Sequence, residues 1–91
     1  YYASEELRGD REIVLTAVKK DAISFRYASQ KLRGDRDIAL IAVQQYGYLL
    51  QYATEELRGD RDIVLAAVQQ EGEALRYASE KMREKLKKEG Y

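Results

Sequence analysis

Three Arg-Gly-Asp triplets are the segments with the clearest potential for chemistry. They are Arg8-Gly9-Asp10, Arg33-Gly34-Asp35 and Arg58-Gly59-Asp60. The triplet resembles the integrin-binding sequence of adhesion proteins, which offers its carboxylate to a metal ion from an exposed, extended loop. Here each aspartate directly precedes an apolar helical pattern, where its carboxylate is expected to cap the helix. We therefore interpret the triplets as structural corners, in which Gly9, Gly34 and Gly59 end one helix and Asp10, Asp35 and Asp60 begin the next.

The sequence lacks residue types on which enzyme catalysis most often depends. The chain contains no His and no Cys, which removes the commonest general base, the thiol nucleophile and the commonest metal ligands. Its Ser and Thr hydroxyls therefore have no His to activate them. Carboxylates such as Asp60 and Asp62 lie at helix starts, where they are stabilised as anions and make poor proton donors. We expect no enzyme activity, no metal site, no cofactor and no small-molecule substrate.

Charge argues against a polyanionic partner. The 91 residues carry 16 basic and 16 acidic side chains, so there is no net field to attract nucleic acid or an acidic membrane. Arginines do recur in rows, one of them Arg11, Arg36 and Arg61, and repeat proteins can read RNA with such rows. Acidic neighbours, for example Glu55 near Arg58 and Asp62 beside Arg61, favour a solvated face of ion pairs. RNA binding is therefore the weaker alternative.

A tandem repeat positions these residues. Leu-Arg-Gly-Asp-Arg begins at Leu7, Leu32 and Leu57, and Tyr-Ala-Ser/Thr recurs with the same 25-residue step. A fixed period of this length is typical of solenoids. Each repeat predicts two helices. In the middle of the chain these are one helix over residues 36–45, which is apolar nearly all round, and an amphipathic helix over residues 48–58. The sequence thus predicts an all-α fold, an α-solenoid of antiparallel helix pairs. It forms a single domain over 1–91, with repeats at about 2–26, 27–51 and 52–76 and a C-terminal capping helix at 77–91.

Glycines are expected to separate the paired helices. Gly47 and Gly72 suit the left-handed conformation that often ends a helix, and Ala22 at the same position predicts a strained or different first turn. The tyrosines of the Tyr-Ala-Ser/Thr words are expected to pack at the edge of the core. The polar, Lys-rich C-terminus suits a terminal unit facing water, so the N-terminal end is the less protected one.

These repeats resemble a known family. They are similar to a domain of unknown function that forms short helical hairpins. The similarity rests on the words Tyr-Ala-Ser-Glu-Glu-Leu-Arg, Asp-Arg-Asp-Ile-Val-Leu-Ala-Ala-Val and Gln-Gln. Members of that family occur in tandem copies within large proteins of protists and intracellular bacteria. The resemblance covers residues 2–80. The family usually has Asn where this chain has Gly9, Gly34 and Gly59, and it implies no activity, cofactor or catalytic residue. Repeats this similar to one another also suggest a designed or consensus-built version.

The sequence thus predicts a structural scaffold with protein binding along one face. The candidate binding strip is polar and varies between repeats: Glu12, Lys19, Asp37, Gln44, Asp62 and Gln69. The main alternative is a self-assembling module, a homo-oligomer formed through the N-terminal end. No apolar run approaches the roughly 20 residues of a membrane span, and the first residues do not resemble a signal peptide. We expect a soluble chain with no membrane partner, and its localisation stays open.

Overall fold

The computed structural model describes residues 10–91, and every regular element in this range is helical. Its three ten-residue α-helices begin 25 residues apart: α2 (Arg11–Lys20), α4 (Arg36–Gln45) and α5 (Arg61–Gln70). A six-residue 3₁₀-helix follows each: η1 (Ala22–Tyr27), η2 (Gly47–Tyr52) and η4 (Gly72–Tyr77). Short helices come next: α3 (Gln30–Arg33), η3 (Leu57–Gly59) and the longer α6 (Glu80–Lys88). The all-α class predicted from the sequence is confirmed.

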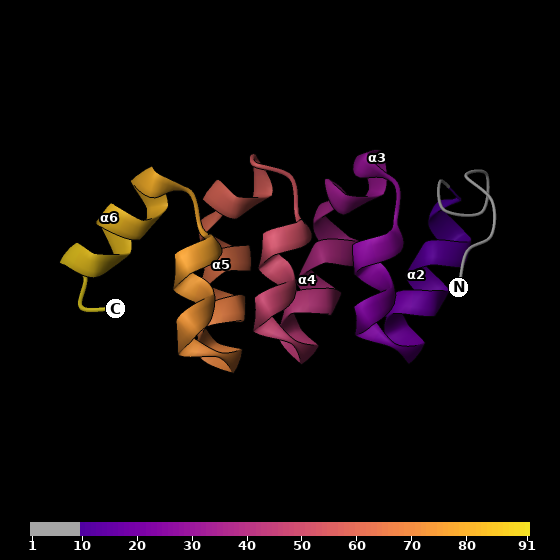
Figure 1. Cartoon of the computed structure of the whole chain (residues 1–91), viewed down its shortest axis with the longest axis horizontal. Helices are drawn as coiled ribbons and strands as arrows, with labels where there is room; N and C mark the ends of the chain where they lie inside the picture. The colour runs from indigo at the N-terminus through magenta and orange to yellow at the C-terminus, as the bar shows by residue number, and fades with distance from the viewer. Residues whose placement is uncertain (1–9) are drawn as a thin grey trace.

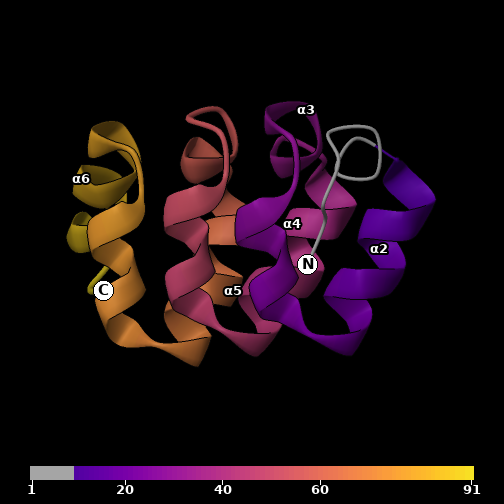
Figure 2. The ribbon, with the colours of Figure 1, turned by 45° about the vertical axis from the view of Figure 1, so that its right-hand side comes forward.

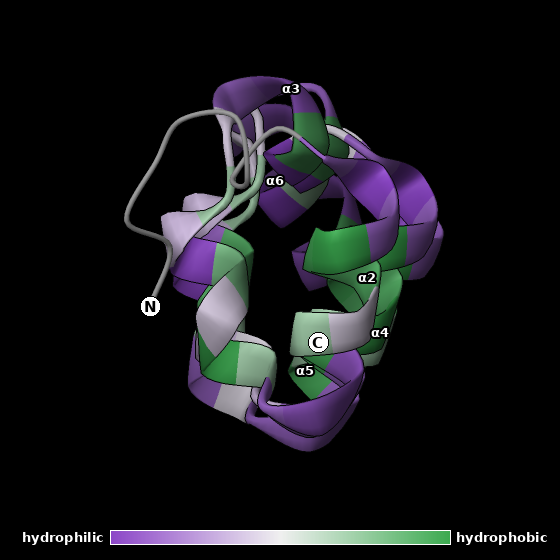
Figure 3. Cartoon of the chain, turned by 90° about the vertical axis from the view of Figure 1, so that its right-hand side faces the viewer, coloured by the Kyte–Doolittle hydropathy of each residue, from purple (hydrophilic) through white to green (hydrophobic). Residues whose placement is uncertain are grey.

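We refer to α2–η1–α3, α4–η2–η3 and α5–η4–α6 as the first, second and third units. The units lie side by side along the longest axis of the molecule (Figure 1). Within them, the α-helices form one row and the 3₁₀-helices a second row (Figure 2), with the short helices at one edge of both. Seen from the end, apolar segments face the space between the rows, and polar segments cover the corners (Figure 3).

Aspartates start the α-helices. The Oδ1 atom of Asp35 accepts hydrogen bonds from the backbone N–H groups of Asp37 (3.1 Å) and Ile38 (3.2 Å), and Asp60 caps α5 in the same way. Asp10 accepts one such bond, from Ile13. These carboxylates satisfy N–H groups that have no partner within the helix. The Arg-Gly-Asp corner is thus fixed by local chemistry.

The prediction of one continuous second helix over residues 48–58 is wrong. The chain is extended at Ala53 (ψ 158°), and η2 ends before it. Thr54 begins the next segment, and its backbone N–H donates to the Arg33 carbonyl of the preceding unit. The same break recurs before Ser79, whose N–H donates to the Arg58 carbonyl (2.9 Å) and whose Oγ accepts from Met82 N–H. The Tyr-Ala-Ser/Thr word is therefore a helix break stabilised by contact between units.

The prediction that glycines in a left-handed conformation end the helices is also wrong. Among residues 10–91 only Gly90 has a positive φ. The α-helices end instead at extended residues of similar conformation, Asp21 (φ −148°), Tyr46 (φ −137°) and Glu71 (φ −143°). The turn before Ala22 is therefore not different from the others. Gly9 lies outside the described residues.

The core fills the space between the two rows and continues from unit to unit. Its fully buried side chains include Val14, Ile38 and Ile63 from the α-helices and Phe25 and Leu50 from the 3₁₀-helices. Leu32 and Leu57 of the short helices are buried as well. No helix of residues 10–91 combines the length and apolar character that a membrane crossing requires.

Candidate interaction surface

The polar strip lies on the exposed side of the row of α-helices. All six of its residues are exposed, and they form two levels: Glu12, Asp37 and Asp62 near the helix starts, and Lys19, Gln44 and Gln69 near the helix ends. Each level repeats with the 25-residue step of the units. The fold therefore brings these residues onto three successive helices.

An arginine from each of the first two units joins the strip to the helix caps of the next unit. Arg11 donates from Nε to Asp35 (2.6 Å) and pairs through Nη2 with Asp37 (3.3 Å). Arg36 repeats this pattern with Asp60 (2.8 Å) and Asp62 (2.9 Å). We call these contacts the arginine ladder. It holds the half-exposed guanidiniums in place and fixes the positions of two strip carboxylates.

The ladder lowers the pKa of the capping aspartates. The hydrogen bond from Arg11 holds the pKa of Asp35 below its ordinary value, and partial burial opposes this shift. Asp60 has a lowered pKa for the same reason, through Arg36. Hydrogen bonds that favour the charged form have this effect. Both carboxylates are already used by a helix start and a guanidinium, which argues against an integrin-like role for these triplets.

The sequence identified the acids and the arginines but not their pairing. We expected pairs within a unit, such as Glu55 with Arg58 and Asp62 with Arg61. The ion pairs between described residues join different segments instead, because an arginine at a helix start reaches the adjacent helix start. Among the described residues no further ten-residue α-helix follows α5, and Arg61 pairs instead with Glu89 beyond α6 (2.5 Å). The regular 25-residue step was the signal that could have predicted such contacts.

A shallow groove lies beside the level of the strip that is near the helix ends. It has a volume of about 220 Å³ and is lined by Gln44, Ala66, Gln69 and Gln70. The Gln70 amide donates to the Gln44 carbonyl across the groove. The groove thus presents amide groups of two neighbouring units.

Aromatic and cationic residues occupy the row of 3₁₀-helices. The Arg26 guanidinium lies over the rings of Tyr27 (5.2 Å) and Tyr52 (5.4 Å), and Arg76 lies over Tyr77 (5.5 Å). Tyr27 is exposed, whereas Tyr52 and Tyr77 pack partly against the core. The first tyrosine of this row, Tyr2, lies outside the described residues. The cation–π contact between Arg26 and Tyr52 links the first unit to the second.

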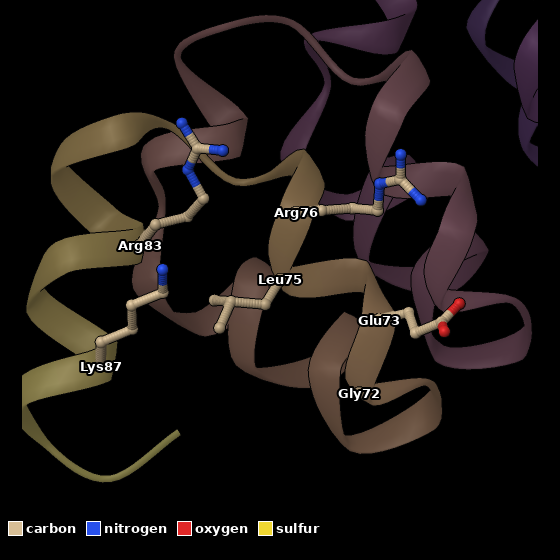
Figure 4. A pocket seen from close by; sticks show the side chains of 6 residues that line it. All are labelled: Gly72, Glu73, Leu75, Arg76, Arg83 and Lys87. Carbon is tan, nitrogen blue, oxygen red and sulfur yellow. The ribbon is translucent and has the colours of Figure 1, made fainter.

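A larger pocket lies between η4 and α6 (Figure 4). Its volume is about 400 Å³, and its lining is Gly72, Glu73, Leu75, Arg76, Arg83 and Lys87. Arg83 and Lys87 reach from α6 toward the side of η4 that carries Leu75. The pocket therefore combines an apolar side chain with cations at the end of the row of units. Residues 10–91 contain no group of acidic side chains that could hold a metal ion.

Comparison with known families identifies the family of this chain. The model of a domain of unknown function, DUF4116, matches residues 1–33 and 35–83. The chain belongs to this family. No curated protein and no solved structure matches it. Membership in DUF4116 assigns no activity, and a designed or consensus-built origin stays a prediction.

The corner glycines Gly34 and Gly59 lie close to side chains of the next unit. A Cβ added to Gly34 would lie 3.0 Å from Thr54 Cγ2, and one added to Gly59 would lie 3.3 Å from Ser79 Oγ. These neighbours are side chains of the next unit, which can yield by a few tenths of an ångström. Neither glycine has a positive φ. Both positions can therefore accept Asn with a small adjustment between units.

Proposed function

We propose that this chain is a non-catalytic α-solenoid scaffold, a single domain over residues 1–91. The recurrence of α-helix, 3₁₀-helix and short helix every 25 residues supports a stacked-repeat architecture. Each unit would pair an α-helix with a second helix broken at the Tyr-Ala-Ser/Thr word. The arginine ladder and the shared core supply the contacts between units.

The scaffold would bind another protein along the polar strip. The observation that carries this proposal is the alignment of six exposed polar side chains at two levels on three successive α-helices. Asp37 and Asp62 are held by arginines, so a partner would meet carboxylates that lose little side-chain freedom on binding. The groove beside Gln44 and Gln69 offers amide donors and acceptors at the other level. The expected partner is a polar protein segment that crosses neighbouring units.

Site-specific cross-linking tests this proposal. A photoreactive residue at Gln44 would capture a partner from cells that make the protein, and the same residue at Gln30, on a short helix, is the control. The captured protein is then purified and its affinity measured. We expect Gln44→Arg with Gln69→Arg to weaken binding at least tenfold, because two large cations fill the groove, which is on the order of 1.4 kcal/mol.

The matched variant changes two exposed glutamines elsewhere, Gln30→Arg with Gln51→Arg. It adds the same charge away from the strip and should bind normally. Equal weakening by both variants would instead indicate a general effect of charge. A loss confined to the control would place the interface on another face and overturn the proposal.

A further inference from the structure

In the first and second units, the next unit covers the surface at the end of the unit. In the third unit, part of the equivalent surface stays uncovered. Leu75 of η4 is only partly buried, whereas its counterparts Phe25 and Leu50 are fully buried. A Cβ on Gly47 would collide with the Ala67 carbonyl of the next unit, but a Cβ on Gly72 would have no neighbour within 4 Å. The end of the third unit therefore resembles an inter-unit contact surface with part of its partner missing.

The first unit carries the matching surface at the opposite end. Ile13 is 38% exposed, whereas Ile38 and Ile63 at the same position are fully buried. Asp10 and Glu12 hold the positions at which Asp35 and Asp37 receive Arg11. Neither acid forms an ion pair with another residue of 10–91. This end thus presents the acceptor side of the arginine ladder and an apolar side chain.

We infer that these two ends bind each other, so that a second copy of this chain stacks head to tail on the third unit. In the register of the interior units, Arg61 would meet Asp10 and Glu12 of the second copy. Arg76 would lie over Tyr27 of the second copy, as Arg26 lies over Tyr52. Leu75 would be covered as Leu50 is. Each contact repeats one already made within the chain.

The C-terminal segment covers part of this surface and opposes the stacking. Lys85 and Lys87 hold the sequence positions 25 residues after Asp60 and Asp62, so the chain supplies cations where the ladder acceptors would come next in the sequence. Arg61 is instead held by Glu89, at 2.8 and 2.5 Å. Leu86 is fully buried and anchors the segment. The pocket beside Leu75 is the part of the surface that α6 leaves open (Figure 4).

Association therefore requires the last turns of α6 to leave the end of the third unit. The exchange replaces one carboxylate on Arg61, that of Glu89, with those of Asp10 and Glu12 from a second copy. Contacts between unlike ends can add further copies, because each new copy brings its own third unit, whose end opens when its α6 leaves. The homo-oligomer predicted from the sequence forms through the N-terminal end, and the sequence did not indicate the surface that this end contacts. The end of the third unit is the surface to which that end would bind, and this contact shares only Glu12 with the polar strip.

The test uses full-length variants that release α6. Glu89→Lys breaks the ion pair with Arg61 without touching the core, and Leu86→Glu removes the buried anchor. Glu84→Lys makes the same charge change as Glu89→Lys at an exposed position of α6. Solution mass is measured by light scattering after size exclusion over a dilution series. We expect both releasing variants to associate at least tenfold more tightly than the parent chain, and Glu84→Lys to match the parent.

A second substitution shows which ends meet. Ile13→Arg added to Glu89→Lys should restore the mass of one chain, because it blocks the opposite end. Mixed with the parent chain, this double variant should form a two-chain complex and nothing larger. Releasing variants that keep the mass of one chain would overturn the inference. Association that persists after Ile13→Arg would also overturn it, since the contact would then lie on other surfaces.

Discussion

At the scale of residues, Asp35 and Asp60 each perform two structural tasks. Each carboxylate caps the α-helix that follows it and receives an arginine from the preceding unit. The local task follows from the position of the aspartate before a helix. The second task requires that two units lie side by side. The same residue therefore couples the start of a helix to the contact between units.

This coupling makes stability dependent on acid. The folded-state pKa values of Asp35 and Asp60 are lowered. As the pH falls below about 4, the unfolded chain therefore binds more protons than the folded chain does. The stabilisation is present above the ordinary carboxyl pKa and is lost as the pH falls through the folded-state values. We expect the urea midpoint to drop between about pH 5 and pH 2.

Arg36→Gln should make this acid dependence shallower, because it removes the guanidinium that lowers the pKa of Asp60. Arg26→Gln is the control, since Arg26 contacts tyrosine rings and no carboxylate among the described residues. An equal loss with pH in Arg36→Gln and the parent chain would contradict a role for the ladder.

Two glycines at equivalent positions provide a matched pair of substitutions. Gly47→Ala should lower the free energy of unfolding by about 1–3 kcal/mol, because the new Cβ meets the Ala67 carbonyl. Ala22 fills this position in the first unit, so the cost is that of a local shift. Gly72→Ala meets nothing and should change stability by less than about 0.5 kcal/mol. Urea unfolding of both variants measures the difference, and equal values would contradict the close approach at Gly47.

At the scale of elements, α2 and α4 have nearly the same design but different surroundings. Both are capped by an aspartate, both have ten residues, and both carry Ile at the third position. Ile38 is enclosed by units on either side, whereas Ile13 lies at the N-terminal end of the described row. Helix formation is therefore local, but burial of the same side chain depends on the neighbouring unit.

Substituting these two isoleucines separates the local from the tertiary contribution. Ile38→Ala should cost about 2–5 kcal/mol, because it leaves a cavity in the core. Ile13→Ala should cost less than about 1 kcal/mol, because more than a third of its surface is already exposed. Thermal unfolding followed by circular dichroism measures both. A similar loss in the two variants would mean that helix propensity, and not stacking, dominates.

At the scale of the whole molecule, we expect stability to be shared along the row of units. The row measures 42 Å along its longest axis and 16 Å along its shortest. A single 25-residue unit encloses too little apolar area to fold alone, so the contacts between units carry the fold. Weakening the second unit should therefore weaken both of its neighbours.

Native-state hydrogen exchange can measure this sharing residue by residue. In Ile38→Ala, we expect amide protection to fall in α2 and α5 as well as in α4, because α4 supplies an interface to each. The exposed substitution Gln51→Ala is the control and should leave protection unchanged. If only the α4 amides lost protection, the units would be energetically independent.

The sequence by itself determined the features that depend on near neighbours along the chain. The ten-residue α-helices and the aspartate caps follow from apolar periodicity and capping preference, which act within a few residues. The 25-residue step follows from the recurrence of the same words along the chain. The leucines that begin the repeated word, Leu32 and Leu57, are buried in the structure.

Only the tertiary structure decided the features that depend on a neighbouring unit. The predicted helix over residues 48–58 is interrupted at Ala53, and the N–H of Thr54 donates to a carbonyl 21 residues earlier. Gly47 lies close to an approaching carbonyl and does not adopt a left-handed turn. The arginine ladder joins residues 24 and 26 positions apart, a pairing that arises when helices stack. Such contacts are set by the distance between units, which the pattern of one unit does not contain.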